Sequence, residues 1–204
     1  MVDEGTLTVV SNNLADQEYL REHTGISSSW IPSLCRYTRA RYQRRKRTFI
    51  WQARSDVGLE LTAATRRHLI SPERAFRRLG RPRRYRWSEL YSYAGIVHIP
   101  YQVSTMSIFE QYTANVPLFF PSRELLLSLR EESIGDALAD LSNFDLLGGN
   151  GQRRGLNKTS DGDVLGRWLD LADFYDERAM PFIVYYESFE HLAHLLDMTD
   201  LDLV

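Results

Sequence analysis

Residues 93–122, in the middle of the chain, carry the clearest pattern of hydrophobic and polar positions. A short apolar run at residues 95–99 is typical of a strand buried on both faces, and Pro100 ends it. Apolar side chains then recur at helical spacing over residues 106–114, and a second apolar run follows at residues 116–120. Strand, helix and strand in this order predict a βαβ unit with parallel strands and a right-handed crossover.

Similar patterns predict further elements on both sides of this unit. The predicted strands lie at residues 7–10, 48–53 and 182–186, and the predicted helices lie at residues 14–24, 59–70, 87–93, 123–133, 134–143 and 164–179, with two more that begin at Pro72 and after Ser188. Residues 148–163 have the composition of a flexible loop. A full Rossmann-like domain needs one strand more than this pattern locates, so either a strand is hidden or the domain is reduced.

The turn between the first central strand and its helix is where a ligand is expected. Ligands of open parallel sheets bind outside the carboxyl ends of the strands, and the first turn of a helix offers free N–H groups to an anion. Ser104 and Thr105 are cap candidates, and with Met106 and Ser107 they supply those amides. Glu110 lies one turn further in, where a carboxylate can accept hydrogen bonds from a sugar diol. This combination predicts a nucleotide site.

These residues resemble the donor-binding segment of the C-terminal domain of GT-B glycosyltransferases. Residues 104–118 read STMSIFEQYTANVPL, where the family carries the pattern E-A-x-A-x-G-x-P on the helix after the strand. The resemblance implies an α/β fold with a Rossmann-like parallel sheet flanked by helices, a nucleotide-sugar donor, and no metal. It also implies that Glu110 holds the donor ribose. Gln102 replaces the glutamate of many retaining members, and Asn115 replaces the family's glycine before the second strand.

The resemblance continues more weakly toward the N-terminus. Arg54 matches an arginine that often contacts the donor phosphates after the first strand of the domain, whereas the lysine expected about five residues later is missing. By this resemblance, residues 1–32 form the end of an N-terminal domain, residues 33–47 form a basic linker, and residues 48–204 form the nucleotide-sugar-binding domain. Most of the acceptor-binding half then lies outside the chain, and the catalytic base stays unassigned.

Composition limits the other classes of protein. The chain has 204 residues, of which 43% are hydrophobic, and no apolar run approaches the roughly 18 residues needed to cross a bilayer. Its acidic N-terminus is unlike a signal peptide, and the single cysteine, Cys35, excludes an internal disulfide. A cytoplasmic protein is therefore expected. The histidines show no spacing typical of a metal site, even at His191 and His194.

Charge is strongly segregated along the chain, although the net charge is only −2. Residues 36–86 hold 17 of the 25 basic residues and three of the 27 acidic ones, a local charge of +14, so the remainder carries −16. Such a segment is typical of a nucleic-acid or membrane-surface patch, or of one lobe of a cleft that attracts anionic substrates. The acidic remainder would repel a polyanion, which disfavours nucleic acid.

The sequence thus predicts a glycosyltransferase-like protein that binds a nucleotide sugar and transfers the sugar to an acceptor. The sequence does not identify this acceptor. Two other readings stay open. In one, the chain is a non-catalytic or partner-dependent nucleotide-binding module, which Gln102 and the missing lysine favour. In the other, the chain binds a polyanion through residues 36–86.

Overall fold

The structure is a computed structural model, and it describes residues 7–52, 57–70, 77–78, 86–100, 104–131, 166 and 169–198. The expected helix at residues 134–143 and the expected loop at residues 148–163 lie outside these ranges.

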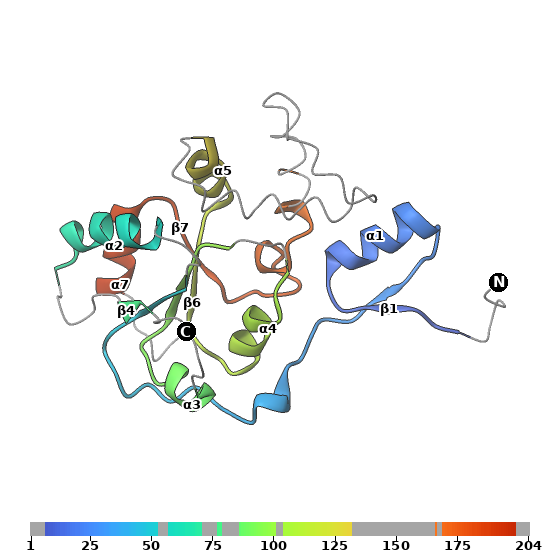
Figure 1. The fold of residues 1–204 in the computed structure, drawn as a ribbon, viewed down its shortest axis with the longest axis horizontal. Helices are drawn as coiled ribbons and strands as arrows, with labels where there is room; N and C mark the ends of the chain where they lie inside the picture. The colour runs from blue at the N-terminus through green and yellow to red at the C-terminus, as the bar shows by residue number, and fades with distance from the viewer. Residues whose placement is uncertain are drawn as a thin grey trace.

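A five-stranded sheet forms the centre of the described chain (Figure 1). Its strands, in chain order, are β3 (Ile50–Gln52), β4 (Arg77–Arg78), β5 (Ile96–His98), β6 (Leu118–Pro121) and β7 (Val184–Tyr186). They lie in the spatial order β4-β3-β5-β6-β7, and every neighbouring pair is parallel. The predicted βαβ unit is confirmed, because β5 pairs with β6 in parallel through Ile96 and Leu118.

Helices cover both faces of this sheet, and the two-residue alternation of the strands divides the core between them. On one face lie α2 (Val57–His68), α5 (Arg123–Glu131) and α7 (Phe189–Met198), and on the other lie α3 (Trp87–Leu90) and α4 (Met106–Thr113) (Figure 1). Val97 and Phe119 pack into the first core with Leu126. Their neighbours Ile96 and Leu118 point the other way, into the core beneath α4. The architecture is therefore α/β, a parallel sheet flanked by helices.

The strand that the sequence pattern could not locate is β4, at the edge of the sheet. Arg77 and Arg78 pair in parallel with Ile50 and Trp51 of β3. The helix expected to begin at Pro72 does not include residues 77–78, which form this strand. Two arginines carry no apolar alternation, and an edge strand can form through backbone hydrogen bonds alone.

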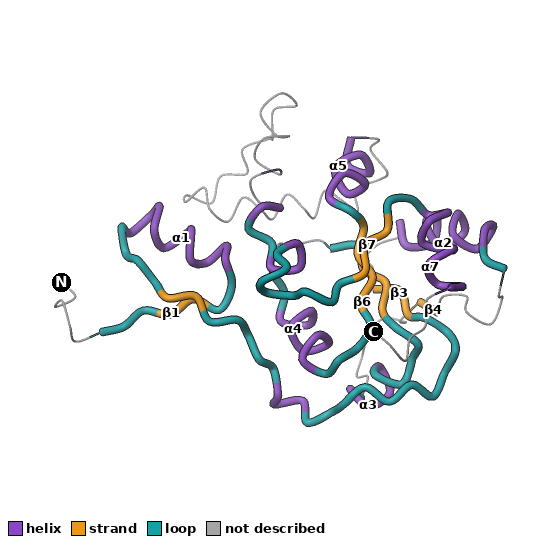
Figure 2. The backbone as a smooth tube through the Cα atoms, turned by 180° about the vertical axis from the view of Figure 1, so that it is seen from behind, coloured by secondary structure: helices purple, strands orange, loops and turns teal. Residues whose placement is uncertain are grey.

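A smaller unit precedes the sheet and is seen apart from it in Figure 2. It consists of β1 (Val10–Ser11), α1 (Leu14–Thr24) and β2 (Ser29–Trp30), with β1 and β2 parallel. Asn13 caps α1 by accepting a hydrogen bond from the N–H of Asp16, and Gly25 ends it in the left-handed conformation, with φ of 69°.

The basic segment between the two units is fixed along the main domain. After the short 3-10 helix η1 (Arg36–Thr38), the Tyr42 N–H donates to the Ala114 carbonyl at 2.9 Å and the Gln43 N–H donates to the Tyr91 carbonyl at 3.0 Å. The Arg45 N–H likewise donates to the Ser92 carbonyl at 2.9 Å. The backbone of this segment is therefore held against the ends of α3 and α4.

In the described chain, no helix is both long and apolar enough to cross a membrane.

Gly95 permits the close approach of the central strands, which generates a stability prediction. A Cβ at this position would lie 2.9 Å from the Pro117 carbonyl oxygen and 3.1 and 3.2 Å from the rings of Phe119 and Phe49. We expect Gly95→Ala to destabilise the fold by about 1–3 kcal/mol, because the backbone oxygen cannot move aside. Urea unfolding measures the loss. Gly166→Ala is the control, since its Cβ would meet only an arginine nitrogen at 3.5 Å; an equal loss in both variants would contradict the steric explanation.

Candidate functional site

The order of the strands defines where a ligand is expected to bind. If the five strands are numbered 1 to 5 by their order in the chain, their order across the sheet is 2-1-3-4-5. The topological switch point of such a sheet lies between strands 1 and 3, which are β3 and β5. Gln52 and His98, at the carboxyl ends of these strands, are paired in register. The expected donor residues Arg54 and Gln102 follow these strand ends in sequence, but both lie outside the described residues.

The start of α4 stands directly after this edge. Thr105 is the N-cap residue, as expected, but its side chain makes no capping hydrogen bond; its hydroxyl lies 3.2 Å from that of Ser107. Ser104, Thr105 and Ser107 are partly exposed, and Met106 is 48% exposed. The first turn of α4 is therefore open to solvent, with uncapped N–H groups that can receive an anion.

Glu110 occupies the second turn of α4, but it is buried. Its side chain is 6% exposed, and burial raises the pKa of the carboxyl group. The hydroxyl of Tyr37, from η1, donates a hydrogen bond to Glu110 Oε1. Tyr37 is itself 62% exposed, so a surface side chain covers the carboxylate. Helical spacing places Glu110 on the same side of α4 as Met106 and Ser107.

The segment that carries Tyr37 is anchored one turn further along α4. The Cys35 N–H donates to Thr113 Oγ1 at 3.1 Å, and the Cys35 side chain is 3% exposed. Burial raises the pKa of this thiol, and the charge of Glu110 raises it further. Cys35 is therefore a protonated thiol near neutral pH, and its role here is to pack.

His98 is a core histidine. Its Nε2 lies 2.8 Å from Gln111 Oε1, and its ring stacks on Phe120 with centroids 4.6 Å apart. Burial lowers its pKa to about 4, while the hydrogen bond with Gln111 raises it, so the ring is neutral at physiological pH. Within the described residues no group of three or more His, Cys, Asp or Glu side chains is placed to hold a metal ion.

Asp173 is a buried acid that the sequence pattern did not single out. It begins the 3-10 helix η4 (Asp173–Tyr175), where one continuous helix was expected over residues 164–179; that expectation is wrong here, because Phe174 turns inward to stack on Phe120 at 4.8 Å. The Asp173 side chain is 1% exposed, and neither carboxylate oxygen makes a regular hydrogen bond to a described residue.

The surroundings of Asp173 explain its titration. Burial raises its pKa to about 7, the nearby N–H groups of Leu14 and of Asp173 itself lower it, and the charges of Asp176 and Asp16 raise it. The Leu14 N–H belongs to the first turn of α1, so Asp173 is also a contact between the N-terminal unit and the main domain. Only the tertiary structure brings residues 14 and 173 together.

The Tyr37–Glu110 hydrogen bond gives a testable consequence. We expect Tyr37→Phe to destabilise the fold by about 1–3 kcal/mol at pH 7, because it leaves a buried carboxylate without its donor. Urea unfolding of Tyr37→Phe, Glu110→Leu and the double variant forms a cycle that measures the coupling, because leucine offers no acceptor to the hydroxyl. Additive losses would contradict a direct hydrogen bond.

Asp173 gives a pH-dependent prediction. Its folded pKa of about 7 lies above the unfolded value of about 3.9, so the folded state binds the proton more tightly and stability is lost as pH rises from about 4 to about 7. We expect Asp173→Asn to remove this loss and to be more stable than the wild type at pH 8, by on the order of 2–4 kcal/mol. Urea unfolding at pH 5 and pH 8 tests it. Glu177→Gln, at an exposed position, should leave the pH profile unchanged.

Comparison with known proteins gave no match. No protein-family model, no curated protein and no solved structure matches the chain. The GT-B resemblance therefore stays a prediction, and the function has to be inferred from the chain's own residues.

Proposed function

We propose that the chain is the nucleotide-sugar-binding part of a glycosyltransferase with a Rossmann-like, GT-B type fold. In this proposal the diphosphate of the donor lies at the start of α4, and its ribose lies beside Glu110. The donor transfers its sugar to an acceptor bound largely outside the described residues. The helix N-terminus, with Arg54, which follows β3 in the sequence, stabilises the negative charge of the leaving diphosphate.

The position of α4 supports this site. The helix follows β5, one of the two strands at the switch point, and in open α/β sheets ligands bind in the crevice at that point. Its first turn is uncapped and partly exposed at Ser104, Thr105 and Ser107. Helix N–H groups without a capping side chain are suited to phosphate oxygens.

The observation that carries the proposal is the hydrogen bond from the Tyr37 hydroxyl to Glu110. A carboxylate that is 6% exposed loses the hydrogen bonds of water, and it needs a replacement donor. Here the donor is a hydroxyl on an exposed side chain, and a ligand that supplies the same donor would compensate for its loss. A ribose diol offers the same chemical group twice, so it can replace Tyr37 on Glu110.

The non-catalytic alternative uses the same site. A partner-dependent nucleotide-binding module would keep the α4 site and lack an acceptor, and Gln102 in place of a glutamate favours it. Donor binding and sugar transfer are therefore separate steps of the proposal, and binding is tested first.

Ligand-dependent stability tests donor binding. Thermal unfolding would be measured with a panel of nucleoside diphosphates and nucleotide sugars, for the wild type and for Glu110→Gln. A ligand at about 100 times its Kd stabilises the folded state by about 2.7 kcal/mol, or roughly 5–10 °C for a chain of this size. We expect the melting temperature of the wild type to rise with nucleotides of one base, and we expect this rise to be strongly reduced in Glu110→Gln.

The matched control is Glu190→Gln, which removes an exposed carboxylate from the first turn of α7, after β7, two strands away from β5 in the sheet. It should leave the ligand-induced shift unchanged. No shift with any nucleotide, from a folded wild-type protein, would contradict donor binding by this chain. A shift that is equal in all three proteins would remove Glu110 from the site.

A further inference from the structure

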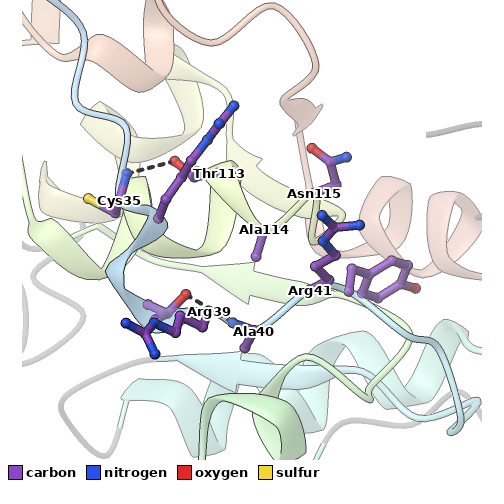
Figure 3. Close-up of a pocket in the computed structure, with 10 residues that line it drawn as sticks. Cys35, Arg39, Ala40, Arg41, Thr113, Ala114 and Asn115 are labelled. Atoms are coloured by element: carbon purple, nitrogen blue, oxygen red, sulfur yellow. Dashed lines mark hydrogen bonds between the residues drawn. The ribbon is translucent and has the colours of Figure 1, made fainter.

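The basic segment and the end of α4 enclose a pocket of about 830 Å³. Residues 35–42 without Tyr37 form one wall, and Thr113, Ala114 and Asn115 form the other. Figure 3 shows Arg41 reaching toward Asn115 across the pocket, with Arg39 on the opposite side and Cys35 beside Thr113. The pocket is large enough for a small polar molecule or a headgroup.

Among the described residues, the pocket is lined by positive charge and by no acid. Arg36, Arg39 and Arg41 line it, all three are exposed, and none forms an ion pair within the described chain. No acidic side chain is among the described residues that line it. Three guanidinium groups without a counter-ion favour an anion with more than one negative charge.

Hydroxyl donors accompany these charges. The Thr113 hydroxyl oxygen accepts the Cys35 N–H at 3.1 Å, and the Thr38 hydroxyl oxygen accepts the Ala40 N–H at 3.4 Å. Because each oxygen is used as an acceptor, each O–H remains available to donate to a ligand. Arginine forks and hydroxyl donors together match the oxygens of a phosphate group.

The walls of the pocket are held in an uncommon backbone conformation. Within the described chain, Arg39 and Asn115 are the two residues other than glycine with positive φ, at 53° and 61°, and both line this pocket. A left-handed arginine costs about 1–2 kcal/mol. The hydrogen bond from the Tyr42 N–H to the Ala114 carbonyl, at 2.9 Å, joins the two walls and holds this geometry. Strain of this kind is concentrated at binding sites.

The pocket is separate from the proposed donor site. The donor site uses the first turn of α4, whereas the pocket lies at its last residue, Thr113. The eight residues of α4 span about 12 Å, so the arginines stand at the opposite end of the helix from the donor phosphates. The positive charge of residues 36–41 therefore lies away from the proposed donor phosphates.

We infer that this pocket is a second binding site, for a phosphate-bearing ligand with at least two negative charges. The phosphate lies between Arg39 and Arg41, and the hydroxyls of Thr38 and Thr113 donate to its oxygens. The ligand is either a free phosphorylated compound or the headgroup of an anionic lipid. The site does not depend on the proposed donor site, because no residue is shared between them.

Two probes test the inference and separate these sources. Calorimetric titration with pyrophosphate measures binding of free phosphate, and sedimentation with vesicles that contain phosphatidic acid measures binding of a headgroup. We expect Arg39→Gln/Arg41→Gln to weaken binding of the effective probe at least tenfold, with an unchanged melting temperature. Loss of pyrophosphate binding identifies a free ligand, and loss of vesicle binding alone identifies a lipid.

Arg47→Gln is the matched control, since Arg47 is an exposed arginine of the same basic segment outside the pocket. It should retain wild-type binding. Equal weakening by Arg47→Gln and the double substitution would overturn the inference, because binding would follow overall charge, as for a single-stranded oligonucleotide on a basic surface. It would also be overturned if the wild type bound neither probe, or if binding survived the double substitution.

Discussion

Two adjacent strands, β5 and β6, are buried on both faces, and this constraint arranges the rest of the structure. Because successive side chains point to opposite sides, Val97 and Phe119 must be covered by α5 and α7 while Ile96 and Leu118 must be covered by α4. The backbones approach so closely at Gly95 that a side chain has no room there. The sheet is therefore enclosed between helices, and the proposed donor site lies at its carboxyl edge.

Helix α4 connects this core to both candidate sites. Ile108 and Phe109 fix the helix on the sheet, its first turn stands at the carboxyl edge, and its last turn forms a wall of the arginine-lined pocket. The segment 35–42 follows the same helix from outside, with Tyr37 on Glu110 and Cys35 on Thr113. A ligand that displaces Tyr37 from Glu110 would therefore move a segment that also lines the second pocket.

Charge and burial differ between the buried acids and the arginine-lined pocket. Glu110 and Asp173 are acids whose pKa values are raised by burial, so both are held where water is largely excluded. Within the part of the chain that the structure describes, the arginines of residues 36–41 are exposed and have no acidic partner. Perturbed acids are common where ligands are bound and protons exchanged, whereas unpaired exposed arginines are suited to capturing anions.

The sequence by itself determined the central βαβ unit and, within two residues at each end, the helix α2, because both depend on local periodicity. It could not reveal β4, since Arg77 and Arg78 carry no apolar alternation and join the sheet through backbone hydrogen bonds. Only the tertiary structure decided that Tyr37 meets Glu110, that Asp173 meets α1, and that the arginines after Cys35 lie at the far end of α4. These contacts join residues 73, 159 and about 75 positions apart, and no local pattern encodes which distant segments pack together.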